Sequence, residues 1–187
     1  MEHKLYTPVT KEQLSQLRVG DRVLLTGTVY TARDAAHKRL MELLDKGEPL
    51  PFSLPGSVIY YVGPTPEKPG QVIGSAGPTT SGRMDAYSPR LLDLGQSAMI
   101  GKGGRSPEVI DAIRRNGVVY LAALGGAGAL MGACVESLKV ICWEDLGCEA
   151  VRELQVRDMP LTVAIDSTGA SIYDSGPAAY LNSLEAL

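Results

Sequence analysis

The chain has 187 residues, of which 44% are hydrophobic and 21% are charged, and its formal net charge is −3. This composition is that of a globular protein, and the length suits one domain spanning residues 1–187. The positive charge is not gathered into a stripe and no apolar run reaches 18 residues, so we expect neither a nucleic-acid partner nor a membrane span. A polar N-terminal segment without a secretory signal, together with an odd number of cysteines (three), favours a reduced cytoplasmic setting.

The first half of the chain predicts strands and helices in alternation. Residues 6–18 are expected to be a short lead-in with a helix cap at Thr10. Residues 23–30 (VLLTGTVY) are rich in β-branched side chains and predict a strand, which leads through a capping-box pattern at residues 31–34 (TARD) into a helix ending at Gly47. Two more strands are expected at residues 58–62 and 71–75, followed by a Gly- and Ser-rich loop at residues 77–83.

The second half continues the alternation. A short strand at residues 98–100 is followed by a helix that Ser106 caps, that has Pro107 at its first position and that ends at Gly117. The later elements expected are a strand at 118–124, a small-residue helix ending near Glu136, a strand at 139–143 and a hairpin over 161–173. Alternating strands and helices indicate the α/β class with a mixed sheet.

Three predicted loops each place a cation beside glycine or at a strand end. Arg33 opens a helix with His37 one turn later, Arg83 follows Thr79 by four residues, and Lys102 lies between two glycines. Ligands of open α/β sheets collect at strand ends, and three cations there suit a small dicarboxylate, since arginine grips a carboxylate with two parallel hydrogen bonds. The alternative is that these are solvated surface cations.

Hydroxyl groups lie beside the second of these cations. Thr79, Thr80 and Ser81 precede Arg83, and a hydroxyl can act as a base only where neighbouring charges lower its pKa. Hydroxyls in such loops also cap turns, and a single histidine on a helix, such as His37, is more often structural than catalytic.

Two further patterns are weak. Cys134, Cys142 and Cys148 lack any Cys-x-x-Cys spacing, which favours core thiols over an iron–sulfur ligand set. Gly126 and Gly128 follow a predicted strand, with Glu144 at the end of the next, and so form a partial dinucleotide fingerprint. A close helix–strand packing turn is the simpler interpretation of those glycines.

Four segments together carry a family resemblance: residues 27–37 (GTVYTARDAAH), 77–85 (GPTTSGRMD), 100–103 (IGKG) and 143–147 (WEDLG). They resemble motifs of the β subunit, or C-terminal half, of the class I iron–sulfur fumarate hydratases and L(+)-tartrate dehydratases. The resemblance covers residues 6–173. It implies a swivelling β/β/α domain and a reversible hydration of fumarate to L-malate.

The resemblance also implies a division of labour between two subunits. A separate α subunit would hold a 4Fe-4S cluster with three cysteines of its own. Cys134, Cys142 and Cys148 would then not be cluster ligands, and this chain would bind no metal. The expected assembly is an α2β2 heterotetramer in which this chain alone is inactive.

By the same resemblance, Arg33, Arg83 and Lys102 clamp the substrate carboxylates and Thr79 is the base at carbon. Thr80 could serve in place of Thr79, and both threonines, with His37, are assigned to the substrate-binding set.

The resemblance separates two substrates. Gly82 and Asp85 fit the fumarate form, whereas the tartrate form is expected to carry a bulkier residue and a glutamate at those positions. Fumarate is therefore the preferred substrate and L(+)-tartrate the alternative. Two other interpretations stay open: a non-catalytic module that binds small anions, and a nucleotide-binding oxidoreductase fragment based on Gly126 and Glu144.

Overall fold

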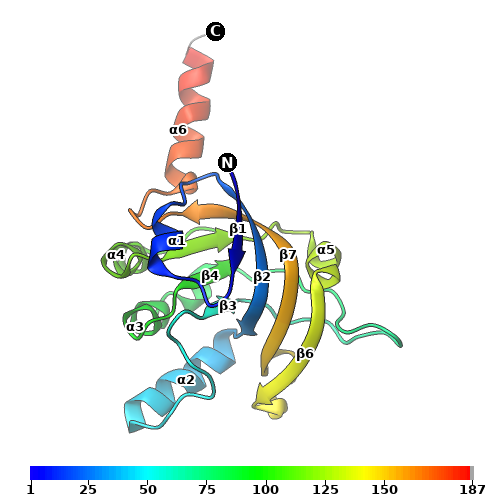
Figure 1. The fold of residues 1–187 in the computed structure, drawn as a ribbon. Coiled ribbons are helices and arrows are strands. Elements are labelled where there is room, and N and C mark those ends of the chain that lie inside the picture. The colour runs from blue at the N-terminus through cyan, green and yellow to red at the C-terminus, as the bar shows by residue number, and fades with distance from the viewer. Residues whose placement is uncertain (186–187) are drawn as a thin grey trace.

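The computed structural model describes residues 1–185, and its centre is a closed barrel of five strands with two further strands outside it (Figure 1). The sheet order is β1-β2-β3-β4-β5-β7-β6, and an additional pairing of β2 with β7 closes the barrel. Strands β2 to β5 run parallel, and β7 is antiparallel to both β2 and β5. The strands are β1 (Glu2–Tyr6), β2 (Arg22–Thr31), β3 (Val58–Tyr60), β4 (Ala98–Gly101), β5 (Val119–Ala122), β6 (Val135–Cys142) and β7 (Val151–Ile165). The fold is therefore mixed α/β, as predicted.

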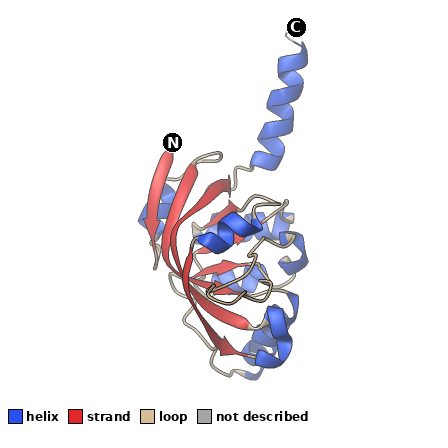
Figure 2. Ribbon diagram, turned by 90° about the vertical axis from the view of Figure 1, so that its right-hand side faces the viewer, coloured by secondary structure: helices blue, strands red, loops and turns tan. Residues whose placement is uncertain are grey.

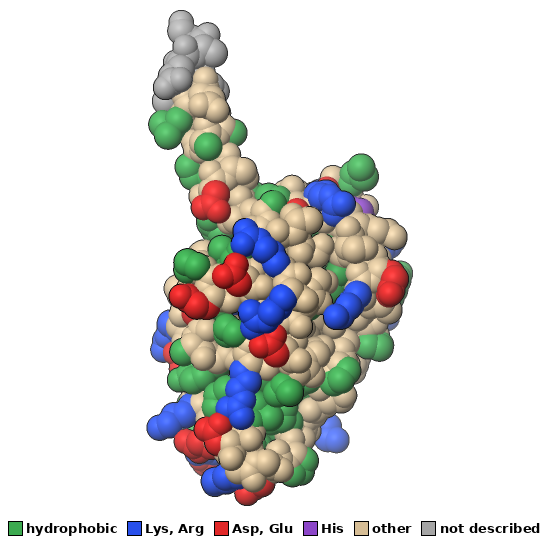
Figure 3. All heavy atoms as spheres, turned by 90° about the vertical axis from the view of Figure 1, so that its left-hand side faces the viewer, with side chains coloured by type: hydrophobic (Ala, Val, Ile, Leu, Met, Phe, Trp, Pro, Cys, Tyr) green, Lys and Arg blue, Asp and Glu red, His purple; other side chains and the backbone are tan. Residues whose placement is uncertain are grey.

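Helices cover the outside of the barrel, and one helix leaves it. The helices are α1 (Lys11–Ser15), α2 (Asp34–Lys46), α3 (Ser88–Asp93), α4 (Pro107–Asn116), α5 (Gly128–Ala133) and α6 (Ile172–Glu185), with 3-10 turns η1 (Ser81–Met84) and η2 (Glu144–Glu149). Figures 1 and 2 both show α6 projecting away from the body. Figure 3 shows positive and negative side chains interspersed over the side that faces its viewer.

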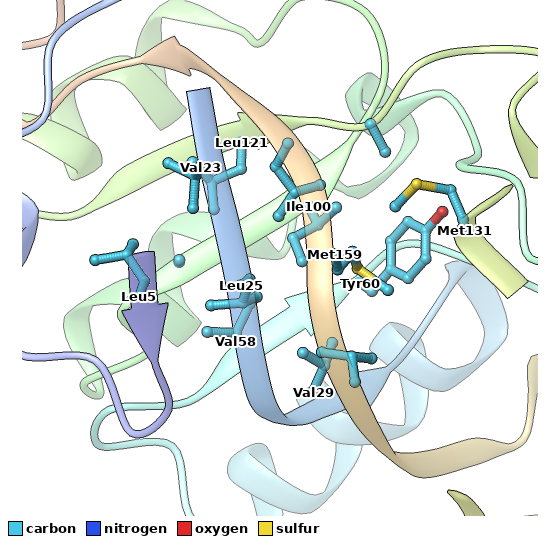
Figure 4. Packing of buried hydrophobic residues seen from close by; sticks show 14 of the residues in the cluster. Leu5, Val23, Leu25, Val29, Val58, Tyr60, Ile100, Leu121, Met131 and Met159 are labelled. Carbon is cyan, nitrogen blue, oxygen red and sulfur yellow. The ribbon is translucent and has the colours of Figure 1, made fainter. Parts of the chain in front are cut away.

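The strands alternate between two hydrophobic layers. One set of side chains, including Val23, Val58, Ile100 and Leu121, forms a cluster inside the barrel (Figure 4). The residues between them, such as Ile59, Met99 and Tyr120, belong to a second cluster shared with α2, α3 and α4. Successive side chains of a strand point to opposite faces, so strands that are buried on both faces need apolar residues at almost every position.

A bulge in β7, opposite the segment of β2 that contains Gly27, helps the long strands to curve around the barrel. The register between β2 and β7 shifts between Leu25 and Gly27. Gly27 has φ +115°, and a Cβ built there would come 2.3 Å from Thr7 Oγ1. Only glycine fits both the left-handed backbone and the close approach of the β1–α1 connection.

Several predicted boundaries are confirmed, because their signals are local. Thr10 forms a capping box with Gln13 at the start of α1. Helix α2 ends at Gly47 (φ +69°), and α4 runs from Pro107 to a left-handed Gly117 (φ +65°). These residues supply their own capping geometry and need no distant partner.

The capping box predicted at residues 31–34 is wrong. Helix α2 starts at Asp34 with Arg33 at the N-cap and no capping side-chain hydrogen bond. Thr31 Oγ1 instead donates to the Ala150 carbonyl (3.3 Å) and accepts from the Arg152 backbone N–H (3.0 Å), which ties the end of β2 to the start of β7. The tertiary contact replaces the local one.

Two predicted elements in the apolar stretches are also wrong. Residues 71–75 form no strand, because Thr65 and Ser75 close a loop by exchanging two hydrogen bonds (3.0 and 2.8 Å). The hairpin over residues 161–173 reduces to one isolated bridge between Ile165 and Ser171, after which α6 begins. Ser171 Oγ accepts from the Tyr173 backbone N–H (3.2 Å) and so starts a helix rather than a returning strand.

The segment after the fifth strand differs in its boundaries. The small-residue helix ends at Ala133, and Glu136 lies within β6, since β6 already pairs with β7 at Val135. Two strand segments, residues 2–6 and the first half of β7, were not predicted from the sequence patterns. Within the described residues, no helix combines the length and apolar character that crossing a membrane requires.

Candidate active site

The carboxyl ends of three adjacent parallel strands lie in register. Thr31 of β2 pairs with Tyr60 of β3, which pairs with Ile100 of β4. Neighbouring strands are about 4.8 Å apart, so the three ends span roughly 10 Å. Arg33 and Lys102 each lie two residues beyond this row. The strand ends therefore place two of the predicted cations at one edge of the sheet.

The threonine segment lies between the ends of β3 and β4. The Thr79 N–H donates to the Tyr61 carbonyl (2.7 Å), and the Lys102 N–H donates to the Thr79 carbonyl (3.3 Å). Thr80 and Lys102 form an isolated parallel bridge, and the Ser81 N–H donates to the Lys102 carbonyl (2.9 Å). These backbone bonds bring the predicted hydroxyls beside the predicted lysine.

One carboxylate connects the two predicted arginines. Arg83 Nε lies 2.7 Å from Asp34 Oδ1, and the Arg33 guanidinium lies 3.7 Å from Asp34 Oδ2. Arg83 reaches this position from the last turn of η1, and its side chain is 51% exposed. Asp34 occupies the first turn of α2, where the helix dipole favours negative charge.

A second carboxylate reaches the same place from far along the chain. Glu149, at the end of η2, lies 3.4 Å from the Arg33 guanidinium and also accepts from the Ala35 backbone N–H (2.9 Å). It therefore satisfies a free donor at the start of α2 while it faces Arg33. No local pattern pointed to Glu149, because its partners lie more than 110 residues away in sequence.

Several donors at this edge have no acceptor. Arg33 Nε is buried and lacks a hydrogen-bond partner, and no N–H of that guanidinium donates to any described residue. Among the same residues, the Lys102 ammonium and the hydroxyls of Thr79 and Thr80 also have no hydrogen bond. Buried donors normally find acceptors, so the buried Arg33 Nε points to a missing ligand that is rich in oxygen. Thr79 is half-buried and Thr80 and Lys102 are exposed, so these three donors are open to the same ligand or to water.

His37 lies beneath this edge and is 0% exposed. Its Nδ1 is 2.9 Å from the Arg33 carbonyl, which can only accept, so Nδ1 carries the hydrogen and Nε2 is unprotonated in the neutral ring. Nε2 has no partner among the described residues, and the ring packs against Tyr61 and Tyr87. Burial lowers the pKa of His37 to about 4. The structure thus places His37 behind Arg33, in contact with its backbone.

A buried ion pair that the sequence patterns missed lies next to the site. The Arg105 side chain is 0% exposed, and its Nε donates to Asp85 Oδ1 at 2.6 Å. Arginine is rarely buried, and nothing in the local sequence distinguishes Arg105 from the surface arginines of α4. Its neighbours come from the residue after β3 (Tyr61), from β4 (Met99) and from β5 (Tyr120).

The three thiols do not form a metal site. Cys134 donates to the Leu130 carbonyl (3.3 Å), and burial raises the pKa of both the Cys134 and Cys142 thiols, which disfavours the thiolate that binds metal. Among the side chains that the structure describes, no group of three or more His, Cys, Asp or Glu is arranged to hold a metal ion. These cysteines therefore do not fit an iron–sulfur cluster.

Of the two glycines in the partial dinucleotide fingerprint, Gly128 has a packing role, whereas Gly126 meets no atom within 4 Å and has a left-handed backbone (φ +82°). A Cβ on Gly128 would come 2.2 Å from Ser75 Oγ, and one on Gly132 would come 2.5 Å from the Gly74 carbonyl. Helix α5 is six residues long. The small residues thus let this short helix lie directly on the loop at residues 74–77.

Comparison with known proteins identifies the family of this chain. Residues 2–176 match the protein family described as "Fumarase C-terminus". Fumarate hydratase 2 of Leishmania major is 40% identical over 173 residues, which are 90% of this chain and 30% of that protein. The aerobic class I fumarate hydratase of Escherichia coli (strain K12) is 40% identical over 163 residues, or 86% of this chain and 30% of that protein.

A third relative has nearly the same length as this chain. The putative L(+)-tartrate dehydratase subunit beta of Methanocaldococcus jannaschii is 44% identical over 175 residues, which are 90% of each chain. This chain therefore spans 30% of the two fumarate hydratases and 90% of the tartrate dehydratase subunit. It belongs to the Fumarase C-terminus family and is a homologue of class I fumarate hydratases and of L(+)-tartrate dehydratase β subunits.

Proposed function

We propose that this chain is the substrate-binding β subunit of a two-subunit hydro-lyase that reversibly hydrates fumarate to L-malate. The observation that carries the proposal is the group of free donors on Arg33, Lys102, Thr79 and Thr80 at the carboxyl ends of β2, β3 and β4. A dicarboxylate offers acceptor oxygens for these donors and negative charge for the cations among them.

The arginines and the lysine would act on the charge that develops during the reaction. Removing the proton beside a carboxylate, or returning it, moves negative charge onto that carboxylate. Cations already fixed there bind the transition state more tightly than the ground state. Arg83 pairs with Asp34 through Nε, so its terminal N–H groups stay available for a substrate carboxylate.

Thr79 is the proposed base at carbon, with Thr80 as the alternative. Support for either assignment comes from the backbone bonds that hold both residues against Lys102. A cation close to a hydroxyl stabilises its deprotonated form. Thr80 is exposed and Thr79 half-buried, which favours Thr79 as the hydroxyl screened from water.

The proposal needs a partner subunit. The tartrate dehydratase relative is named a subunit beta, and the fumarate hydratases extend well beyond the matched region. An α subunit would hold a 4Fe-4S cluster, whose open iron supplies a Lewis acid for the departing hydroxyl. The expected swivelling β/β/α arrangement, the α2β2 stoichiometry and the cytoplasmic location remain parts of this proposal.

L(+)-tartrate is the second candidate substrate, favoured by the 44% identity to the tartrate dehydratase subunit. Gly82 bears on the choice. A Cβ built there would meet only Asp85 Oδ2, at 3.9 Å, so packing does not require glycine at this exposed position beside Arg83. A larger residue could therefore change substrate selection without changing the fold.

The test is anaerobic co-expression of this chain with its presumed α subunit, followed by turnover measurements on fumarate, L(+)-tartrate and mesaconate. Fumarate should have the highest kcat/KM. Preference for tartrate would transfer the assignment to the second candidate. No turnover of any diacid by a cluster-loaded complex would contradict the proposed function and favour a module that binds small anions.

A further inference from the structure

The buried arginine next to the site has an unusually complete set of partners. Arg105 Nε donates to Asp85 Oδ1 (2.6 Å), and its terminal nitrogens donate to Ser88 Oγ (2.7 Å) and to Met99 Sδ (3.0 Å). The guanidinium also lies over the rings of Tyr61 (5.3 Å) and Tyr120 (5.1 Å). Five elements or connections thus meet at one buried charge.

Asp85 joins the two loops that carry the proposed substrate cations. It directly follows η1, the turn that contains Arg83. Its Oδ1 accepts from Arg105 and its Oδ2 accepts from the Ser106 backbone N–H (2.6 Å). Because residues 105–106 end the loop that begins at Lys102, one carboxylate holds both loops at a fixed separation.

A second chain of hydrogen bonds fixes the same two loops from the other side. Tyr120 Oη donates to the Gly103 carbonyl (2.9 Å), so the 2.8 Å contact between Tyr120 Oη and Ser81 Oγ is donated by Ser81. Burial raises the pKa of Tyr120, which keeps this hydroxyl protonated and able to donate. Ser81 opens η1 and Gly103 follows Lys102, so each loop is held at two points.

The energetics argue that the pair serves geometry. A buried ion pair is seldom more stabilising than apolar residues of the same volume, because desolvation offsets the attraction between the charges. Its directional bonds do, however, determine a unique arrangement of the backbone around it. A packed apolar centre would fill the space between the two loops without setting their separation to a fraction of an ångström.

We infer that Arg105 and Asp85 are positioning residues that set the separation between Arg83 and Lys102 and thereby prepare the site for a dicarboxylate. This inference rests on the proposed function for its catalytic consequence. The side chain of Arg105 is fully buried, so it acts through η1 and the loop after β4 without touching the substrate.

The test compares Asp85→Asn and Arg105→Lys with Asp93→Asn as a matched control. Asp93 accepts two hydrogen bonds of 2.7 Å from Arg115, on the exposed surface between α3 and α4. The Asp93→Asn variant therefore also weakens a short arginine–aspartate pair, but one that lies away from the two loops. Tyr120→Phe is a milder variant that removes the bonds to Ser81 and Gly103 and keeps the ring. If the charge variants fail to fold, Tyr120→Phe alone still tests whether the two loops are held together.

The first measurement is hydrogen exchange on the isolated chain, which needs neither partner nor cluster. Asp85→Asn, Arg105→Lys and Tyr120→Phe should each accelerate exchange at residues 81–85 and 102–106 together by about tenfold or more, while the barrel strands keep their protection. Asp93→Asn should leave both segments unchanged. Acceleration of only one segment, or equal acceleration throughout the chain, would overturn the inference.

The second measurement is turnover by the cluster-loaded complex. A displacement of about 1 Å can cost about a hundredfold in rate, so kcat for the positioning variants should fall about tenfold to a hundredfold after correction for the folded fraction. Asp93→Asn should retain wild-type kcat. Near-normal kcat in folded Asp85→Asn and Arg105→Lys would also overturn the inference. A wild-type complex without turnover would contradict the proposed function alone, because the exchange experiment still decides whether the two loops are coupled.

Discussion

Arg83 Nε lies 2.7 Å from Asp34 Oδ1, although the two residues are 49 positions apart and belong to η1 and α2. The same carboxylate faces Arg33 at 3.7 Å. A side chain of this protein thus contacts both arginines that are proposed to bind substrate carboxylates. Asp34 orients the two guanidinium groups before a substrate arrives, and its charge partly offsets theirs.

This relationship predicts the effect of Asp34→Asn. Loss of the negative charge weakens the bond that orients Arg83, so kcat/KM of the assembled enzyme should fall about tenfold, which corresponds to about 1.4 kcal/mol. Steady-state kinetics with fumarate is the measurement. The control is Asp45→Asn, which removes a carboxylate of α2 that pairs with Arg90 at the surface. Equal losses in the two variants would contradict an orienting role for Asp34.

Arg83→Lys should harm the enzyme far more than its unchanged charge suggests. Lysine lacks the planar fork that binds a carboxylate at two points, and a bidentate contact that strengthens in the transition state should cost about 2–4 kcal/mol, or roughly thirtyfold to a thousandfold in rate. The loss should appear in kcat as well as in KM.

Thr79→Val should lower kcat further than Arg83→Lys does, with little change in folding, because valine matches the shape of threonine but cannot accept a proton. Thr80→Val is the matched control for the neighbouring hydroxyl. Near-normal turnover in Thr79→Val together with a large loss in Thr80→Val would move the proposed base to Thr80.

Acid should destabilise the chain through His37. The unfolded ring takes up a proton below its ordinary pKa of 6.5, whereas the folded ring stays neutral down to about 4. Stability from this group is therefore complete above pH 6.5 and is lost as the pH falls toward 4, by about 3 kcal/mol in all and about 2 kcal/mol between pH 7.5 and 5. Urea unfolding at those two pH values should show this difference in the wild type. Asparagine does not titrate in this range, so in His37→Asn the loss in the free energy of unfolding between the two pH values should be smaller by about 2 kcal/mol. An unchanged loss would mean that other groups cause it.

Gly101→Ala should destabilise the fold by about 1–3 kcal/mol, because a Cβ there would come 1.9 Å from Ser81 Oγ and 3.0 Å from the Tyr61 ring. Gly104→Ala, three residues later, meets no atom within 4 Å and should be close to neutral. Chemical denaturation of both variants is the measurement. Equal stabilities would mean that η1 can move away from β4 without cost.

The isolated chain should bind no stoichiometric cluster after anaerobic reconstitution with iron and sulfide. Raised thiol pKa values at Cys134 and Cys142 disfavour the thiolate ligands that a cluster needs. Iron analysis and a visible spectrum provide the measurement. A stable cluster that is lost on replacing these cysteines would contradict the two-subunit proposal.

The sequence by itself determined the features that depend on neighbouring residues. The capping box at Thr10, the left-handed stop at Gly47 and the Ser-Pro start of α4 are local signals, and the structure contains all three. The sequence also located Arg33 and Lys102 just beyond predicted strands, which is enough to bring them to one sheet edge once those strands pair in parallel.

Only the tertiary structure decided how that edge is completed. Closure of the barrel brings β7 against β2, and this pairing delivers Glu149 to the start of α2 in place of the predicted local cap. It also decided that His37 and the Arg105 side chain are buried, since the residues around them come from separate strands and helices. Helix caps and strand periodicity act over a few residues. Burial and ion pairing depend on chain segments more than 110 residues apart, and packing of the whole core determines whether those segments meet.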